Sequence, residues 1–137
     1  MRFVLASAFL AILGCASRTA LMPINFEYRD DPGRKRVELT YRNSSRHAMC
    51  LLPEHWPNSA GKINQASDAV FLVVGQERFP IKDFNTGYCP QGCATRVAPG
   101  ALLSAFIAYE DFGLPDRLIS AQKSLEFSPV AFECPGK

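Results

Sequence analysis

Cysteine and histidine are the residues of this chain best suited to metal or redox chemistry, and their spacing argues against both. His47, Cys50 and His55 lie close together, and Cys89 and Cys93 follow later in the chain. These residues offer the ligand types of a zinc site, but their spacing matches no common zinc finger. The C-x3-C spacing of the last two differs from the C-x-x-C of redox motifs. We therefore expect no metal, no cofactor and no redox role.

The N-terminal segment has the pattern of an export signal. Arg2 is followed by an uninterrupted run of apolar or small residues, from Phe3 to Leu13. Such a run is too short to cross the roughly 20-residue helical thickness of a bilayer. A charged start followed by a short apolar stretch is typical of a secretory signal peptide. The alternative is a buried N-terminal helix.

The end of this run, Ile12-Leu13-Gly14-Cys15, resembles the lipobox of bacterial lipoproteins. The resemblance implies cleavage before Cys15 and acylation of its thiol and its new amino group, and several acyl chains anchor a protein stably. Because Ala16 and not Asp follows the cysteine, it further implies an outer-membrane lipoprotein that faces the periplasm. The alternative is ordinary cleavage after Ala16, which would give a free periplasmic or secreted protein.

The cysteine count fits an exported protein with two disulfides. The chain has five cysteines, and four remain once Cys15 is lipidated or removed. An even number in an oxidising compartment indicates disulfides, here with three possible connectivities. A Cys89–Cys93 bridge is sterically easy because the loop between them is short, and it leaves Cys50 to pair with Cys134. The chain-entropy estimate is about 2 kcal/mol for the short loop and about 4.5 kcal/mol for the long one.

Catalytic patterns are missing from the sequence. Only His47 and His55 titrate near neutral pH without a large shift, and no nucleophile elbow, metalloprotease helix, P-loop or dinucleotide fingerprint occurs. The paired acids at 30–31 and 110–111 are expected to be solvated. With 15 basic and 13 acidic residues the formal charge is +2, too weak to indicate a nucleic-acid partner. We therefore predict a protein that is not an enzyme.

Two loops are candidate sites for binding a protein partner. In residues 53–58, prolines flank the only Trp of the chain, and His55 precedes Trp56. A Trp on a restricted loop is a rigid, amphipathic anchor of the kind found at binding hot spots. The second candidate is the segment from Phe84 to Tyr88, next to the predicted short disulfide. In both loops the alternative is that the aromatic side chains close the core.

A basic cluster, Arg-Lys-Arg at 34–36, lies beside a turn. Two interpretations remain open for it. The cluster contacts anionic lipid headgroups at an anchored surface, or it is a solvated turn with no ligand.

From residue 24 onward the dominant hydrophobic period is two, which predicts β-strands. Residues 24–28 and 37–41 flank an Asp-Asp-Pro-Gly turn and predict a hairpin, and residues 69–74 and 78–81 predict a second one. Residues 101–109 are apolar on both faces and predict a central strand. The best helical candidate is short, at 118–125. Seven to eight strands with frequent turns predict an antiparallel β-sandwich, with a small barrel as the alternative.

Part of this order of elements resembles immunoglobulin-like accessory domains of secreted bacterial proteins. The stretch from Asn43 to Leu52 and the Ala98-Pro99-Gly100 turn carry the resemblance. It implies a disulfide-stabilised immunoglobulin-like sandwich but no particular function, because sandwiches host many unrelated tasks. The predicted organisation is a signal peptide at 1–14, a lipidated tether at 15–23 and the β-sandwich at 24–137.

Two functions fit these features. The first is a cell-envelope lipoprotein, held to the membrane through its N-terminal lipid, that acts as a non-catalytic protein-binding module such as an inhibitor, an immunity factor or an assembly accessory. The second is a secreted or periplasmic structural or stress-related β domain without a dedicated ligand.

Overall fold

The computed structural model describes residues 20–64, 69–82, 84 and 94–136. This part of the chain is all-β, as predicted, and every strand pair is antiparallel. The strands are β1 (Met22–Pro23), β2 (Phe26–Asp31), β3 (Arg36–Arg42), β4 (Met49–Leu51), β5 (Val70–Val74), β6 (Glu77–Pro80), β7 (Thr95–Val97), β8 (Leu102–Ala108), β9 (Ser124–Phe127) and β10 (Val130–Glu133).

Two short 3₁₀ helices, η1 (Tyr109–Phe112) and η2 (Asp116–Leu118), lie between β8 and β9. The helix predicted at 118–125 is wrong, because η2 ends at Leu118 and β9 already begins at Ser124. Lys123, just before β9, points into the interior, where its Nζ donates to Asp30. This tertiary contact overrides the local helical pattern of the sequence.

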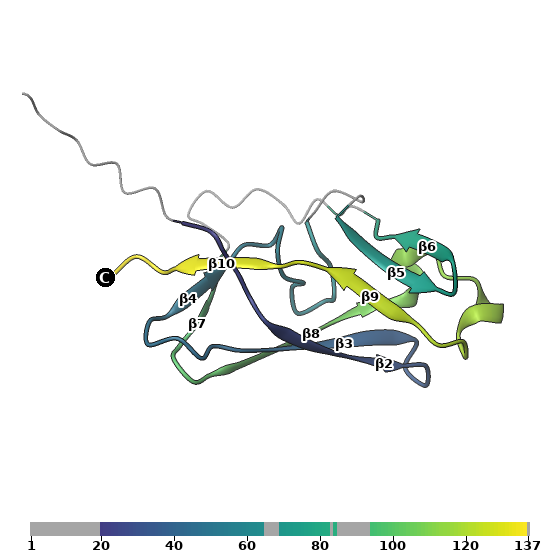
Figure 1. The fold of residues 1–137 in the computed structure, drawn as a ribbon, viewed down its shortest axis with the longest axis horizontal. Coiled ribbons are helices and arrows are strands. Elements are labelled where there is room, and N and C mark those ends of the chain that lie inside the picture. The colour runs from purple at the N-terminus through teal and green to yellow at the C-terminus, as the bar shows by residue number, and fades with distance from the viewer. Residues whose placement is uncertain (1–19, 65–68, 83, 85–93, 137) are drawn as a thin grey trace, which may run out of the picture.

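The strands form three sheets, in the orders β2-β3-β8, β6-β5-β9 and β1-β10-β4-β7 (Figure 1). Both predicted hairpins are confirmed, since β2 pairs with β3 and β5 pairs with β6. In the first sheet Leu39 lies opposite Tyr28 and Ala105, and in the second Leu72 lies opposite Phe79 and Leu125.

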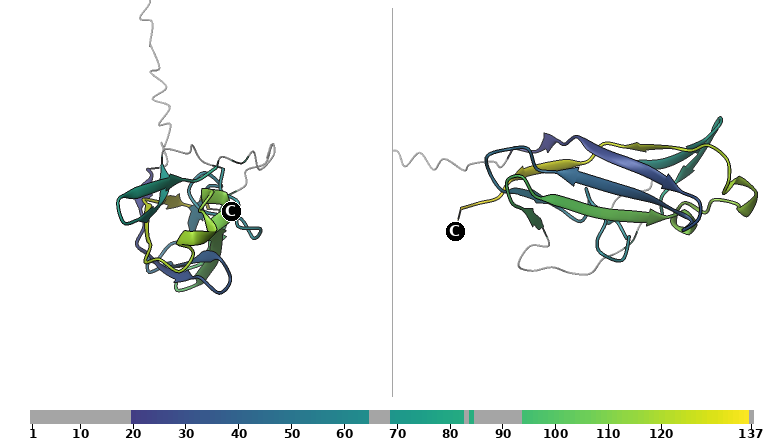
Figure 2. Two further views of the ribbon diagram at one scale, coloured as in Figure 1. Left: turned by 90° about the vertical axis from the view of Figure 1, so that its right-hand side faces the viewer. Right: turned by 90° about the horizontal axis from the view of Figure 1, so that it is seen from below.

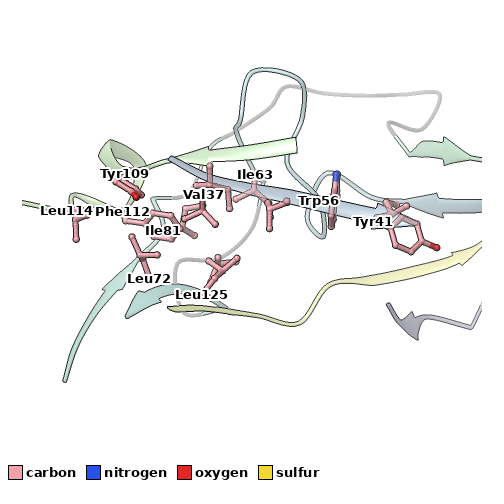
Figure 3. Packing of buried hydrophobic residues seen from close by; sticks show 14 of the residues in the cluster. Val37, Tyr41, Trp56, Ile63, Leu72, Ile81, Tyr109, Phe112, Leu114 and Leu125 are labelled. Atoms are coloured by element: carbon pink, nitrogen blue, oxygen red, sulfur yellow. The ribbon is translucent and has the colours of Figure 1, made fainter. Parts of the chain in front are cut away.

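The hydrophobic core lies where the β2-β3-β8 and β6-β5-β9 sheets face each other (Figure 3). Burial alternates along β3, as the period of two requires, so that Val37, Leu39 and Tyr41 are buried while their neighbours are not. The same alternation buries Val70, Leu72 and Val74 of β5, and Ile107 of β8 is buried in the same core.

Strand β8 is not central, contrary to the prediction from its apolar residues. Among the described residues it pairs only with β3. Its outward-facing Phe106 is nonetheless half-buried, because Gly61 packs against the ring and the Arg36 guanidinium lies 4.8 Å from the ring centroid. A Cβ at Gly61 would stand 2.5 Å from that ring, and Gly61 has a φ of 77°, so glycine is required there.

The third sheet closes one end of the domain. The predicted Cys50–Cys134 disulfide is confirmed, with 5.1 Å between the Cα atoms, and it links β4 to the residue after β10. The predicted Cys89–Cys93 bridge lies outside the described residues. Between β3 and β4 the chain bends at Asn43, whose fully buried side-chain Nδ2 donates to the carbonyls of His47 and Val97.

Both ends of the described chain lie at the end of the domain that this third sheet forms. Met22 of β1 is opposite Ala131 of β10, and Glu133 is opposite Met49. The β2–β3 turn and the two 3₁₀ helices lie at the opposite end (Figure 2). The domain is therefore elongated, with both ends of its described chain at one pole.

Candidate binding surfaces

Residues 52–64, which we term the Trp56 loop, join β4 to the segment before β5 as a compact, hydrogen-bonded loop. The Asn64 N–H donates to the Pro53 carbonyl at 2.8 Å, which closes the base of the loop. At the tip, the Asn58 side chain accepts from the backbone N–H groups of Ala60 and Lys62 at 2.9 and 3.0 Å. A loop whose ends meet and whose own side chains pack it is an Ω-loop, a class that often carries function.

Trp56 is only 3% exposed, so the prediction that it is an exposed anchor is wrong. Its ring lies 6.1 Å from that of Phe26 in an edge-on arrangement and 6.2 Å from that of Tyr41. Figure 3 shows the indole in line with Tyr41 and Ile63 within the core. The alternative interpretation of the sequence, in which Trp56 closes the core, agrees with the position of the side chain. The buried indole holds the loop against the core.

The surface of the Trp56 loop is small and polar. Asn58, Ser59 and Ala60 are exposed at the tip, Glu54 is exposed nearer the base and His55 is half-buried. Partners recognising this loop would therefore meet backbone groups and short polar side chains held in one conformation.

The structure places Phe84, the described residue of the second predicted loop, beside the Trp56 loop. Lys62 of the Trp56 loop places its Nζ 4.5 Å from the ring centroid of Phe84, a cation–π geometry. Phe84 is half-buried, whereas its predicted partner Tyr88 lies outside the described residues. His55 and Phe84 thus belong to segments that meet through Lys62, which the sequence analysis did not single out.

Asp111 of η1 completes this junction. Its Oδ1 lies 2.6 Å from the Lys62 Nζ, and its side chain is only 5% exposed. The expectation that both acids at 110–111 are solvated is therefore wrong for Asp111, which is buried, whereas Glu110 is exposed. Lys82 also donates two hydrogen bonds to the backbone of η1. Its N–H donates to the Asp111 carbonyl, and its Nζ donates to the Glu110 carbonyl. Together these bonds hold the Trp56 loop and the segment leading to Phe84 against one 3₁₀ helix.

A second polar group, at the pole opposite β1, surrounds the buried ammonium group of Lys123. The Lys123 Nζ donates to Asp30 Oδ2 at 3.1 Å and to the carbonyls of Ile119 and Ala121, and its side chain is 1% exposed. The Tyr109 hydroxyl donates to the other oxygen of Asp30. Burial, together with this carboxylate, raises the pKa of Tyr109, so the phenol stays protonated at neutral pH. The arrangement is a satisfied structural network and offers no exposed nucleophile.

Each residue of the basic cluster at 34–36 has an ion-pair partner, and Lys35 pairs with Asp116 at 3.6 Å. Arg29, Arg34 and Arg36 all reach Glu38, at 2.5, 3.1 and 2.8 Å. The hydrogen bonds from Arg36 and then Arg29 lower the pKa of Glu38 to about 2. This cluster lies beside the β2–β3 turn, at the pole opposite the N-terminal segment (Figure 2). Of the two interpretations left open, its position disfavours contact with the lipid headgroups around an N-terminal anchor.

Over residues 20–64, 69–82, 84 and 94–136, no group of three or more His, Cys, Asp or Glu side chains is placed to hold a metal ion. Within these same ranges no helix has the length and apolar character needed to cross a bilayer. The lipidation candidate Cys15 lies outside the described residues. Comparisons with protein-family models, curated proteins and solved structures found no match to this chain.

Proposed function

We propose that this chain is a cell-envelope lipoprotein, acylated at Cys15, whose domain is a non-catalytic protein-binding module. The surface that meets the partner is formed by the Trp56 loop together with Phe84. Its place is the outer membrane, facing the periplasm. The alternative, a secreted or periplasmic structural or stress-related domain without a dedicated ligand, keeps the same fold but lacks a partner for this surface.

The observation that carries the proposal is the locked junction of Lys62, Asp111 and Phe84. Lys62 of the Trp56 loop is held to η1 by the 2.6 Å ion pair with Asp111 and to Phe84 by a cation–π contact. Trp56 secures the same loop from the core side, so little freedom remains to be lost when a partner binds. Affinity improves when a surface is already ordered, because binding then costs less side-chain and loop entropy.

Support for an immunoglobulin-like sandwich comes from the arrangement of the sheets. The β2-β3-β8 and β6-β5-β9 sheets enclose a common core, and a disulfide ties the third sheet together at one pole. Sandwiches of this kind present recognition loops on a rigid scaffold. We propose that the Trp56 loop uses the scaffold in this way.

The test is site-specific cross-linking in envelope extract with the tagged protein. A photo-reactive amino acid at Ser59, on the exposed tip, should give a discrete cross-linked product, whereas the same group at Ser120, exposed near η2, should not. The substitution Ser59→Arg should lower capture of that product at least tenfold with an unchanged melting temperature, and Ser120→Arg should leave capture intact. Equal products from both positions, or none from Ser59, would favour the alternative without a partner.

Lipidation is tested separately, by partitioning into detergent. The wild-type protein should enter the detergent phase, and a Cys15→Ser variant should stay in water. If both remain in water, the free periplasmic or secreted protein is the correct form, and the proposal for the Trp56 loop is judged by cross-linking alone.

A further inference from the structure

Exposed apolar side chains gather at the pole formed by the third sheet, where the described chain begins at Ala20, here termed the tether pole. Four large hydrophobic residues are prominently exposed among those described, and three of them, Leu21 at 54%, Met22 at 39% and Leu102 at 55%, lie at this pole. A chance scatter of single exposed apolar residues needs no explanation, but a group at one end does.

Two shallow hollows connect these side chains into one surface. One, of about 240 Å³, includes Met22, Asn25 and Arg42 in its lining. The other, of about 520 Å³, includes Asn25, Arg42 and Leu102. Because Asn25 and Arg42 line both, the two hollows adjoin each other, with Met22 of β1 bordering one and Leu102 of β8 bordering the other.

The same pole carries three arginines that form no ion pair among the described residues, although two exposed carboxylates, Glu27 in the larger hollow and Glu133 on β10, lie at this pole as well. Arg46 and Arg96 are exposed and form no ion pair with any residue in the described part of the chain. Arg42 donates to the Gly100 carbonyl at 3.1 Å, which leaves its charge without a counter-ion. The arginines around Glu38, at the opposite pole, are in contrast paired.

The length of the preceding chain places this pole close to a lipid attached at Cys15. Only four residues, 16–19, lie between Cys15 and Ala20, the first described residue. The five steps from the Cα of Cys15 to that of Ala20 span at most about 18 Å when fully extended. A domain anchored at Cys15 therefore cannot move far from the headgroups, and β1, at the start of the domain, is the part nearest to them.

We propose that the tether pole is a docking surface for the anionic headgroups of a phospholipid membrane, with Arg42, Arg46 and Arg96 as the cationic contacts. Leu21, Met22 and Leu102 lie where they meet the interface between headgroups and acyl chains. The inference builds on the proposed lipoprotein function, since anchoring brings this pole to the membrane. Docking would hold the long axis of the domain perpendicular to the membrane. The Trp56 loop, on the side of the domain, would then remain accessible to a partner.

The physical basis is the attraction of clustered arginines to an anionic surface, which acts within a Debye length and weakens as salt rises. The apolar side chains add a component that does not depend on salt. A surface that docks on lipid should show both the salt-dependent and the salt-independent component of binding.

The experiment uses the chain from residue 15 onward with Cys15→Ser, so that binding depends on neither the apolar leader nor acylation, and vesicles of phosphatidylcholine with or without phosphatidylglycerol. We expect cosedimentation with the anionic vesicles at low salt, little with phosphatidylcholine alone, and partial loss at high salt. The double variant Arg46→Glu/Arg96→Glu should bind at least tenfold more weakly. The matched control, Lys35→Glu/Arg117→Glu, changes the same charge at the opposite pole and should bind like the parent.

Three outcomes would overturn the proposal. They are no phosphatidylglycerol-dependent binding, equal losses in the two double variants, and no effect of Leu102→Ser on the binding that persists at high salt. These outcomes are independent of the proposed partner, because Ser59-dependent cross-linking reports on a different surface. Failure of one proposal is therefore distinguishable from failure of the other.

Discussion

Replacing Trp56 with Ala should destabilise the whole domain. The side chain is 3% exposed and packs edge-on against Phe26 and beside Tyr41. Truncating a large buried aromatic residue typically costs about 3–5 kcal/mol, which combines lost apolar transfer energy and the cavity left behind. For a domain of roughly 100 residues each kcal/mol lowers the melting temperature by about 4 °C, so we expect a fall of roughly 12–20 °C.

The assay follows from the composition, because Trp56 is the single tryptophan of the chain. In the wild-type protein its fluorescence should be blue-shifted and shielded from an aqueous quencher, and it should shift to the red as urea unfolds the domain. The Ala variant is followed by circular dichroism on the same urea series. A Trp56→Phe variant is the matched control, since it keeps an aromatic ring in the core and should lose less than half as much stability.

A loss below about 1 kcal/mol in Trp56→Ala would refute the reasoning, because a cost so small is typical of an exposed side chain. Fluorescence accessible to quencher in the folded protein would refute it independently. In either case Trp56 would return to being a candidate contact residue, as the loop sequence alone had predicted.

Three other results are expected from the same structure. Replacing Cys50 and Cys134 by Ala should cost about 4.5 kcal/mol in urea unfolding, since the bridge spans 84 residues, and an unchanged midpoint would contradict this account. Asn43→Ala should cost about 2–3 kcal/mol in thermal unfolding, because two carbonyls at the β3–β4 bend lose their donor; Asn43→Asp, which cannot donate, should do no better. Stability should fall as pH drops from 4.5 towards 2, because the pKa of Glu38 is lowered from 4.5 to about 2 in the folded protein and protons bind the unfolded chain first; Glu38→Gln should show a shallower fall over that range.

The sequence by itself determined the strands and the long disulfide. Alternation of apolar and polar residues over 37–41 fixes which side chains of β3 face the core, because successive side chains of a strand point to opposite faces. The turn at 30–33 and Gly75 fix the two hairpins in the same local way. The four cysteines other than Cys15 allow three connectivities, and the Cys50–Cys134 bridge belongs to one of them.

Burial of single side chains was decided only by the tertiary structure. Trp56 and Asp111 both stand in segments rich in turn-forming or polar residues, and both are buried. No local signal distinguishes a loop tryptophan that points inward from one that points outward, because the answer depends on whether the two sheets leave a space beside Tyr41. Asp111 is buried because Lys62, 49 residues earlier in the chain, reaches it.

The placement of the surfaces was likewise beyond the sequence. Lys62 and Phe84 meet because the Trp56 loop folds over the edge of β8, and the arginines at 42, 46 and 96 share a pole because β3 bends at Asn43 into β4, which pairs with β7. Local periodicity sets which face of a strand is apolar. Long-range packing sets which strands become neighbours, and therefore which exposed groups, distant in the chain, act together.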